Sequence, residues 1–210
     1  MKAYKFRLYP SAEQEKLLIK QLNMCRELYN AFLQQRIYAY RSGRHVGYNQ
    51  QAMEMPGIKS ALPEYRIVHS QVLQDVARRA DKAYQNFYRR VMEKKAGKQI
   101  KAGFPRFKSA ERYRSITYPQ SGFEILENGH LSLSKIGRIR MFMHRQIEEQ
   151  IKTLSLYRER WSGRLVRILL SNSGKTGAYC NSTAFRKMRW RRCRSSASHD
   201  AERWNNHRAT

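Results

Sequence analysis

The chain has 210 residues but only three cysteines and no run of eighteen apolar residues. The lack of such a run excludes an ordinary membrane-spanning helix. Three cysteines in this length do not form a disulfide framework, which favours a reduced, intracellular protein. The first residues alternate charged with apolar side chains and lack the continuous apolar stretch of a secretory signal. We therefore expect a cytoplasmic protein.

Aspartate is also scarce, with only Asp75, Asp81 and Asp200 in the chain. A nuclease that uses two metal ions needs clustered carboxylates, because each Mg²⁺ takes oxygen ligands from converging elements. Asp75 and Asp81 are six residues apart on one expected helix, which places them about 240° apart around its axis. We expect both to be solvated helix charges that offset neighbouring Lys and Arg. The sequence predicts no catalytic residue.

Metal and cofactor signatures are absent as well. Zinc sites need paired ligands at short spacing, and no two cysteines are separated by only two to four residues. Cys180, Cys193, His199 and His207 are separated by twelve, five and seven intervening residues. No complete glycine pattern for a phosphate-binding loop occurs. We therefore expect no metal, no cofactor and no small-molecule substrate.

Positive charge is what the chain has in excess. It holds 42 Lys+Arg against 16 Asp+Glu, a formal net charge of +26. Such an excess indicates a polyanionic partner, most often nucleic acid, with an anionic membrane surface as the lesser alternative. Residues 1–170 hold 33 basic and 14 acidic residues, net +19, and residues 171–210 hold 9 and 2, net +7. The basic character is therefore part of the folding region.

The last forty residues differ in composition from the rest. Residues 171–210 contain no Ile, Leu or Val, whereas residues 1–170 contain 34. A segment without branched aliphatic side chains cannot bury much apolar surface. One interpretation is a basic, disordered tail. The other is a sequence produced by a reading-frame shift or a junction with unrelated DNA, because scattered Cys, Trp and Phe are unusual in disordered chains.

Periodicity predicts a strand and two long helices in the first half. Residues 3–9 alternate, which predicts a half-buried strand with a basic outer face. Ser11 and Gln14 form a capping box at the start of a helix that runs to about residue 42. A connection with one short helix is expected over 43–65, and a second long helix over about 66–95.

After residue 97 the apolar period changes from 3.6 to 2. This favours six short strands, a hairpin turn at 127–129 and another around 162–163; the strand ranges are Arg114–Tyr118, Phe123–Leu126, His130–Leu133, Gly137–Met143, 151–158 and 164–170. The predicted class is α+β, with a helical lobe inserted after a first strand and then a small β-barrel-like unit. The expected division is 1–10, 11–97, 98–170 and a tail over 171–210.

Basic residues interleaved with aromatic ones form the candidate binding surface. Strand alternation places Arg138 and Arg140 on one face, where both guanidinium groups can meet one phosphate backbone. Tyr and Phe can stack on unpaired bases, although most helical aromatics are expected to be core. The predicted nucleic-acid-binding residues are Lys5, Arg7, Arg26, Lys101, Arg106, Lys108, Arg112, Arg114, Arg138, Arg140 and Arg145.

Several short motifs occur in a familiar order over about residues 1–164. They are residues 1–10 (MKAYKFRLYP), 14–18 (QEKLL), Cys25-Arg26 with Tyr29-Asn30, 71–73 (QVL) with Ala83 and Phe87, 103–108 (GFPRFK), and 133–137 (LSKIG) with His144-Arg145. In this order and spacing they resemble the OrfB-type transposase family, also called TnpB. The resemblance implies a transposon-encoded, RNA-guided DNA endonuclease. Its amino-terminal part is described as a helix-turn-helix domain, or as a recognition lobe inserted in a β-barrel wedge.

The resemblance also implies partners and a missing part. The amino-terminal lobes of the family grip the guide RNA and its heteroduplex with target DNA, in the cytoplasm and nucleoid of a bacterium or archaeon. The family continues into an RNase H-like nuclease domain, with Mg²⁺ carboxylates and a four-cysteine zinc ribbon, and none of these motifs is present in this sequence. We therefore expect a truncated member that binds nucleic acid without cutting it. The alternatives are a non-functional pseudogene product and a generic basic RNA-binding protein.

Overall fold

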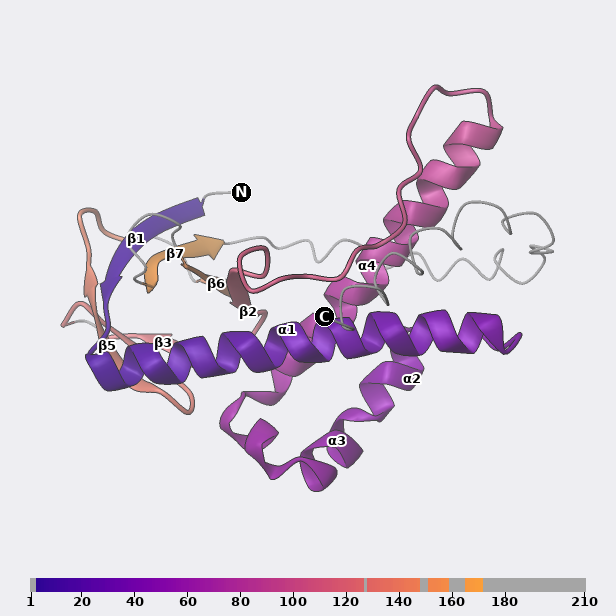
Figure 1. Ribbon diagram of the computed structural model, residues 1–210. Helices are drawn as coiled ribbons and strands as arrows, with labels where there is room; N and C mark the ends of the chain where they lie inside the picture. Colours follow the sequence, from indigo (N-terminus) through magenta and orange to yellow (C-terminus); the bar gives the residue numbers. More distant parts are fainter. Residues whose placement is uncertain (1–2, 127, 148–150, 159–164, 172–210) are drawn as a thin grey trace, which may run out of the picture. The chain divides into compact units, whose positions relative to one another are not determined.

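One strand, a helical segment and six further strands follow one another in the computed structural model (Figure 1). The structure describes residues 3–126, 128–147 and 151–158, and the backbone of 165–171. The helical elements are α1 Ala12–Arg41, α2 Tyr48–Met53, α3 Met55–Ala61, the 3₁₀ helix η1 Pro63–Ile67, and α4 Ser70–Lys95. The strands are β1 Ala3–Tyr9, β2 Ser115–Tyr118, β3 Phe123–Ile125, β4 His130–Leu133, β5 Gly137–Phe142, β6 Thr153–Arg158 and β7 Leu165–Ser171. The α+β class is confirmed.

The first strand belongs to the same sheet as the strands near the other end of the described chain. β1 pairs antiparallel with β5 on one side and with β7 on the other. Tyr4, Phe6 and Leu8 are buried, whereas Lys5 and Arg7 are exposed. The predicted half-buried strand with a basic outer face is therefore confirmed.

The sheet is a curled half-barrel of seven antiparallel strands. Its order is β2-β6-β7-β1-β5-β4-β3, so β1 lies at its centre although it is first in the chain. Aliphatic and aromatic side chains cover the inner face, with Phe6, Ile116, Tyr118, Ile139 and Leu156 at most 2% exposed. In the part of the chain described, β2 and β3 form the two edges and do not pair with each other.

Helix α1 begins and ends at the residues that the capping signals indicate. The Ser11 hydroxyl accepts from the Gln14 backbone N–H at 3.3 Å, and Gln14 Oε1 accepts from the Ser11 N–H at 3.0 Å. The helix ends at Arg41, and the chain then turns at Gly43, which has φ +70°. Gln14 Nε2 also donates to the Arg138 carbonyl at 2.8 Å, which ties the start of α1 to β5.

Helix α4 starts later than the sequence predicts. Val68 is extended, and His69 caps the helix by accepting from the Gln71 N–H at 3.4 Å, so α4 begins at Ser70 rather than near residue 66. The preceding residues form η1, and the connection holds two short helices, α2 and α3, instead of one. Short helices of this kind are fixed by packing against neighbours rather than by their own periodicity.

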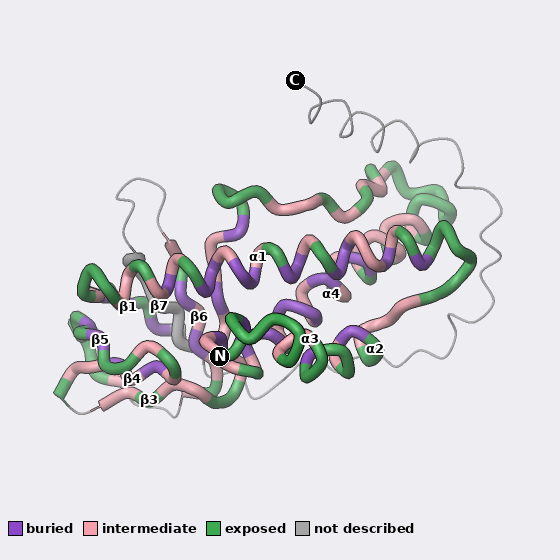
Figure 2. The backbone as a smooth tube through the Cα atoms, turned by 60° about the horizontal axis from the view of Figure 1, so that its bottom comes forward, coloured by how far each residue is buried: buried purple, intermediate pink, exposed green. Residues whose placement is uncertain are grey.

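Helices α1 and α4 run in broadly the same direction because α2, α3 and η1 bring the chain back (Figure 1). Gln21 in the first half of α1 donates to the Ile67 carbonyl just before α4, and Arg36 in the second half pairs with Asp81. Buried positions recur along α1 between exposed ones (Figure 2). Leu18, Leu33, Leu73 and Ala80 are fully buried, and these helical residues share one core with the inner face of the sheet.

The prediction that Asp75 and Asp81 offset neighbouring basic residues is right for Asp75, which pairs with Arg79 on the same helix, but both carboxylates are less solvated than expected. Their side chains are only 18% and 15% exposed. Asp75 accepts from Arg79 Nε at 2.6 Å, and Asp81 lies 3.0 Å from Arg36 Nη1. Arg36 is distant in sequence from Asp81, and its guanidinium compensates a carboxylate that packing has removed from water. The third aspartate, Asp200, lies outside the described residues.

Two apolar positions and the end of the last strand also differ from the prediction. β5 ends at Phe142, so Met143 is 37% exposed instead of facing inward. Tyr40, expected on the apolar side of the first helix, is 48% exposed near the helix end. β7 extends to residue 171, while the remaining residues of the expected tail, and the turn at 162–163, lie outside the described residues.

Candidate nucleic-acid interface

Strands β1 and β5 place cations and aromatic rings together on the outer side of the sheet. Arg7 pairs with Phe142 and Tyr9 with Arg140 in the antiparallel register. Side chains of directly opposed residues lie on the same face of a sheet. We call this surface the basic sheet face; its residues are Lys5, Arg7, Tyr9, Arg138, Arg140 and Phe142, all of them exposed.

The described residues do not neutralise the four cations of the basic sheet face. In the described part of the chain, none of them forms an ion pair with a carboxylate. The acidic residue on the same side of strands β3 to β5 is Glu124, on the edge strand β3. The register places Glu124 opposite Ser132, which in turn lies opposite Arg138. Four uncompensated cations on two adjacent strands favour an anionic ligand with several charges.

A second group of candidate residues lies in the segment between α4 and β2. Asn30 on α1 holds this segment, donating to the Lys108 carbonyl at 3.0 Å and accepting from the Lys108 N–H at 2.8 Å. The segment enters the sheet at β2, the edge opposite β3, so the structure separates this group from the basic sheet face. Its exposed members are Lys101, Arg106 and Arg112, and its half-buried ones are Lys108 and Arg114.

Arg26 and Arg145 are already engaged by the protein. Arg26 is half-buried on α1 and contacts Glu27 at 3.1 Å. The Arg145 guanidinium lies 5.1 Å from the centre of the Tyr4 ring, in cation–π geometry. Arg26 therefore has a carboxylate partner that the four cations of the basic sheet face lack, whereas Arg145 keeps its full charge with its guanidinium over a ring.

The predicted residue set omits two aromatic side chains of the same surface. Tyr9 is 51% exposed and Phe142 is 59% exposed. The signal that could have identified Phe142 is the alternation itself, because it lies two residues from Arg140 and therefore on the same face. The pairing of its strand with β1 could not be predicted from that alternation.

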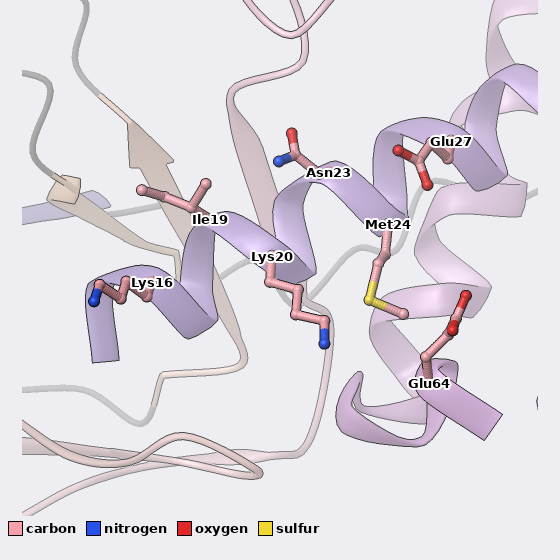
Figure 3. A pocket seen from close by; sticks show the side chains of 7 residues that line it. All are labelled: Lys16, Ile19, Lys20, Asn23, Met24, Glu27 and Glu64. Atoms are coloured by element: carbon pink, nitrogen blue, oxygen red, sulfur yellow. The ribbon is translucent and has the colours of Figure 1, made fainter. Parts of the chain in front are cut away.

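A hollow on the helical side does not suit a polyanion. It has a volume of about 450 Å³ and lies between α1 and η1. Lys16 and Lys20 line it together with Glu27 and Glu64 (Figure 3). The two signs of charge cancel, so this surface offers no net attraction to phosphate.

Two other kinds of site find no support in the described part of the chain. No group of three His, Cys, Asp or Glu side chains there could hold a metal ion. Among the same residues, every helix is too short or too polar to cross a membrane.

Comparison with known proteins identifies the amino-terminal region. Residues 1–45 match the OrfB, IS605-type family described as a helix-turn-helix domain. Residues 1–45 are therefore similar to an OrfB-type helix-turn-helix domain. The predicted resemblance is thereby confirmed. In this structure the described residues of the OrfB-type domain form β1 and the single continuous helix α1.

Two relatives extend the similarity beyond the OrfB-type domain. The chain is 27% identical over 159 residues to "Putative RNA-guided DNA endonuclease InsQ" of Escherichia coli (strain K12), covering 74% of this chain and 37% of that protein. It is 31% identical over 138 residues to a "Putative RNA-guided DNA endonuclease" of Streptomyces pristinaespiralis, covering 64% and 32%. The chain therefore spans about a third of the length of these relatives.

Three polar residues of the resemblance motifs have structural partners in this chain. Gln14 donates to the Arg138 carbonyl. The Asn30 side chain forms two hydrogen bonds with the Lys108 backbone. Gln71 Oε1 accepts from the Ser121 N–H at 2.9 Å. Each joins a helix to a distant part of the sheet or to the segment that enters it. These residues hold the scaffold that supports the basic sheet face.

Proposed function

We propose that the region over residues 1–170 binds nucleic acid as the amino-terminal, guide-RNA-binding part of a TnpB-type protein. The observation that carries the proposal is the basic sheet face, where Lys5, Arg7, Arg138 and Arg140 are exposed and have no carboxylate partner among the described residues. Phosphate oxygens are the ligands that guanidinium groups bind most effectively, through paired hydrogen bonds. The similarity to relatives named as RNA-guided endonucleases supports this choice of ligand.

Binding is proposed without cleavage. Each of the two aspartates among the described residues forms an ion pair with an arginine: Asp75 with Arg79, and Asp81 with Arg36. Two-metal cleavage requires carboxylates that converge on the ions, and the described residues offer no such cluster. The activity in the relatives' names is therefore not assigned to these 210 residues.

The experiment that tests the proposal combines binding with cleavage on the full 210-residue chain. Fluorescence anisotropy with labelled transposon-end RNA should give saturable binding that weakens steeply as salt increases, because phosphate contacts release counterions. Incubation of the same complex with Mg²⁺ and matching DNA should leave the DNA intact. Specific cutting would contradict the absence of cleavage, and no saturable binding at low salt would contradict the function itself.

A generic basic RNA-binding protein is the second candidate, favoured by the high net charge of +26. The two functions differ in selectivity, because charge alone does not distinguish RNA sequences or folds. Competition with random RNA of equal length separates them. Equal competition supports the generic function, whereas preference for transposon-end RNA supports the TnpB-type function.

We also propose that residues 171–210 derive from a reading-frame shift or from a junction with unrelated DNA. The support is their composition, which lacks Ile, Leu and Val and includes two of the three cysteines. If the pseudogene alternative were correct, the region before them would also fail to fold. Cooperative thermal unfolding of the chain distinguishes the two, since a pseudogene product without a complete core would show no transition.

A further inference from the structure

Tyr9 and Phe142 occupy one diagonal of a four-residue cluster on the basic sheet face. Tyr9 lies opposite Arg140 and Phe142 opposite Arg7. The two rings are therefore diagonal neighbours, and the two guanidinium groups occupy the other diagonal. Diagonal neighbours in an antiparallel pair lie about 7–8 Å apart, so cation and ring alternate over a compact surface.

The exposure of these rings is not explained by packing. On the opposite side of β1 the rings of Tyr4 and Phe6 are 6% and 1% exposed, as core residues are. Tyr9 and Phe142 leave 51% and 59% of their surface in water. The Phe142 ring is stacked on His144, with centroids 6.4 Å apart and an angle of 25° between the ring planes. This contact extends the aromatic surface without covering it.

Aromatic rings beside free cations fit one ligand chemistry well. Unpaired bases present their faces to aromatic side chains, while Arg and Lys contact the phosphates of the same strand. In a duplex the base faces are already stacked on one another and are not accessible to these rings. Successive bases in a stacked strand are about 3.4 Å apart, which is less than the diagonal separation of the rings, so two bases would separate to occupy both.

We propose that the basic sheet face binds an unpaired stretch of nucleic acid, with one base on Tyr9 and one on Phe142. Arg7 and Arg140 contact the phosphates on either side of these bases. This inference rests on the proposed function. It adds that the ligand is single-stranded, and it names the residues that favour a single strand over a duplex. The shared chemistry is that of single-stranded RNA and single-stranded DNA, and the experiment compares the two.

The test uses leucine substitutions, which keep apolar volume and remove the aromatic face. Fluorescence anisotropy measures the affinity of the full chain for a 12-nucleotide oligo-U RNA, a 12-nucleotide oligo-T DNA and a 12-base-pair duplex. Tyr9→Leu and Phe142→Leu should each weaken single-strand binding about fivefold or more and change duplex binding less than twofold. Tyr38→Leu is the matched control, because Tyr38 is 57% exposed on α1 and away from this face.

The outcomes separate this inference from the proposed function. Selective loss of RNA binding alone, or of both single strands, supports the stacking site and identifies its ligand. Equal losses on duplex and single strand, or no loss on either, overturn it while leaving nucleic-acid binding in place. A loss of the same size for Tyr38→Leu also overturns it. If the unsubstituted chain binds none of the three probes at low salt, the proposed function fails together with the inference.

Discussion

Arg36 on α1 and Asp81 on α4 form an ion pair inside the helical region, with Nη1 and Oδ1 3.0 Å apart and side-chain exposures of 8% and 15%. Arg36 also donates twice to Gln51 Oε1, at 3.0 and 2.8 Å, and its guanidinium lies 5.0 Å from the centre of the Tyr84 ring. One side chain thus joins α1, α2 and α4. The pair belongs to the scaffold and leaves Asp81 unavailable to a metal ion.

Removing one member of this pair should be costly. Arg36→Met leaves the half-buried Asp81 carboxylate and the buried Gln51 amide oxygen without the guanidinium, so the free energy of unfolding should fall by about 3 kcal/mol. Urea denaturation followed by circular dichroism measures the change. Arg41→Met, at the exposed end of the same helix, is the control and should change stability by about 0.5 kcal/mol or less. Equal effects of the two substitutions would show that the buried pair is not a structural junction.

Removing the buried Tyr118 hydroxyl should increase folding stability. Within the described residues it has no hydrogen-bond partner, and the side chain is fully buried. Tyr118→Phe removes an unsatisfied polar group, and it should therefore stabilise the fold by about 1 kcal/mol. Tyr65→Phe is the comparison, because the Tyr65 hydroxyl donates to the Met24 carbonyl at 3.4 Å. Destabilisation by Tyr118→Phe would show that its hydroxyl has a partner in solution.

Stability should fall in alkali. Burial raises the pKa of six tyrosines, and it raises those of Tyr65 and the Cys25 thiol to about 12. Unfolded tyrosine ionises near pH 10, so above that pH the unfolded chain loses protons that the native chain keeps. The contribution of these buried tyrosines to the free energy of unfolding is complete below about pH 9 and is lost as the pH rises toward 12. Urea midpoints at pH 8, 10 and 11 should decrease in that order, and a constant midpoint would contradict the burial of these phenols.

The proposed reading-frame shift can be checked on the coding DNA. Downstream of codon 164 another frame should encode a Gly-x-Asp-x-Gly motif followed by paired cysteines, as the family resemblance implies. Reading the DNA in all three frames is sufficient. If every alternative frame lacks these motifs, residues 171–210 were not produced by a shift within a nuclease-encoding sequence.

Local patterns predicted much of the fold. Alternation in β1 and β5, and the capping box at Ser11, depend on neighbouring residues, and the structure agrees with them within one or two positions. The charges were harder to place because their partners are distant in sequence. Asp81 contacts Arg36 because α1 packs against α4, and the periodicity of neither helix specifies that contact.

In the candidate site, too, the features set by neighbouring residues could be predicted, and the contacts between distant residues could not. Alternation put Arg138 and Arg140 on one face, which the structure confirms. It could not show that β5 lies beside β1, because strand order depends on closing a long loop through all the helices. That pairing is what brings Arg7 next to Phe142. The resemblance motifs, in turn, gave no sign that Asn30 acts by holding the Lys108 backbone.

The central claim is that the basic sheet face, rather than total charge, binds the phosphates. Its most direct test compares two variants that each lose four positive charges. One carries Lys5→Gln, Arg7→Gln, Arg138→Gln and Arg140→Gln; the other carries Lys16→Gln, Lys20→Gln, Arg66→Gln and Lys82→Gln, all at exposed positions.

The measurement is the slope of log affinity against log salt for single-stranded RNA. Each phosphate contact contributes about 0.7 to that slope. We expect the sheet-face variant to lose about 2 to 3 units of slope, and the control variant to keep the slope of the unsubstituted chain within about 0.7. Equal losses in the two variants would contradict the account, because binding would then depend on net charge alone.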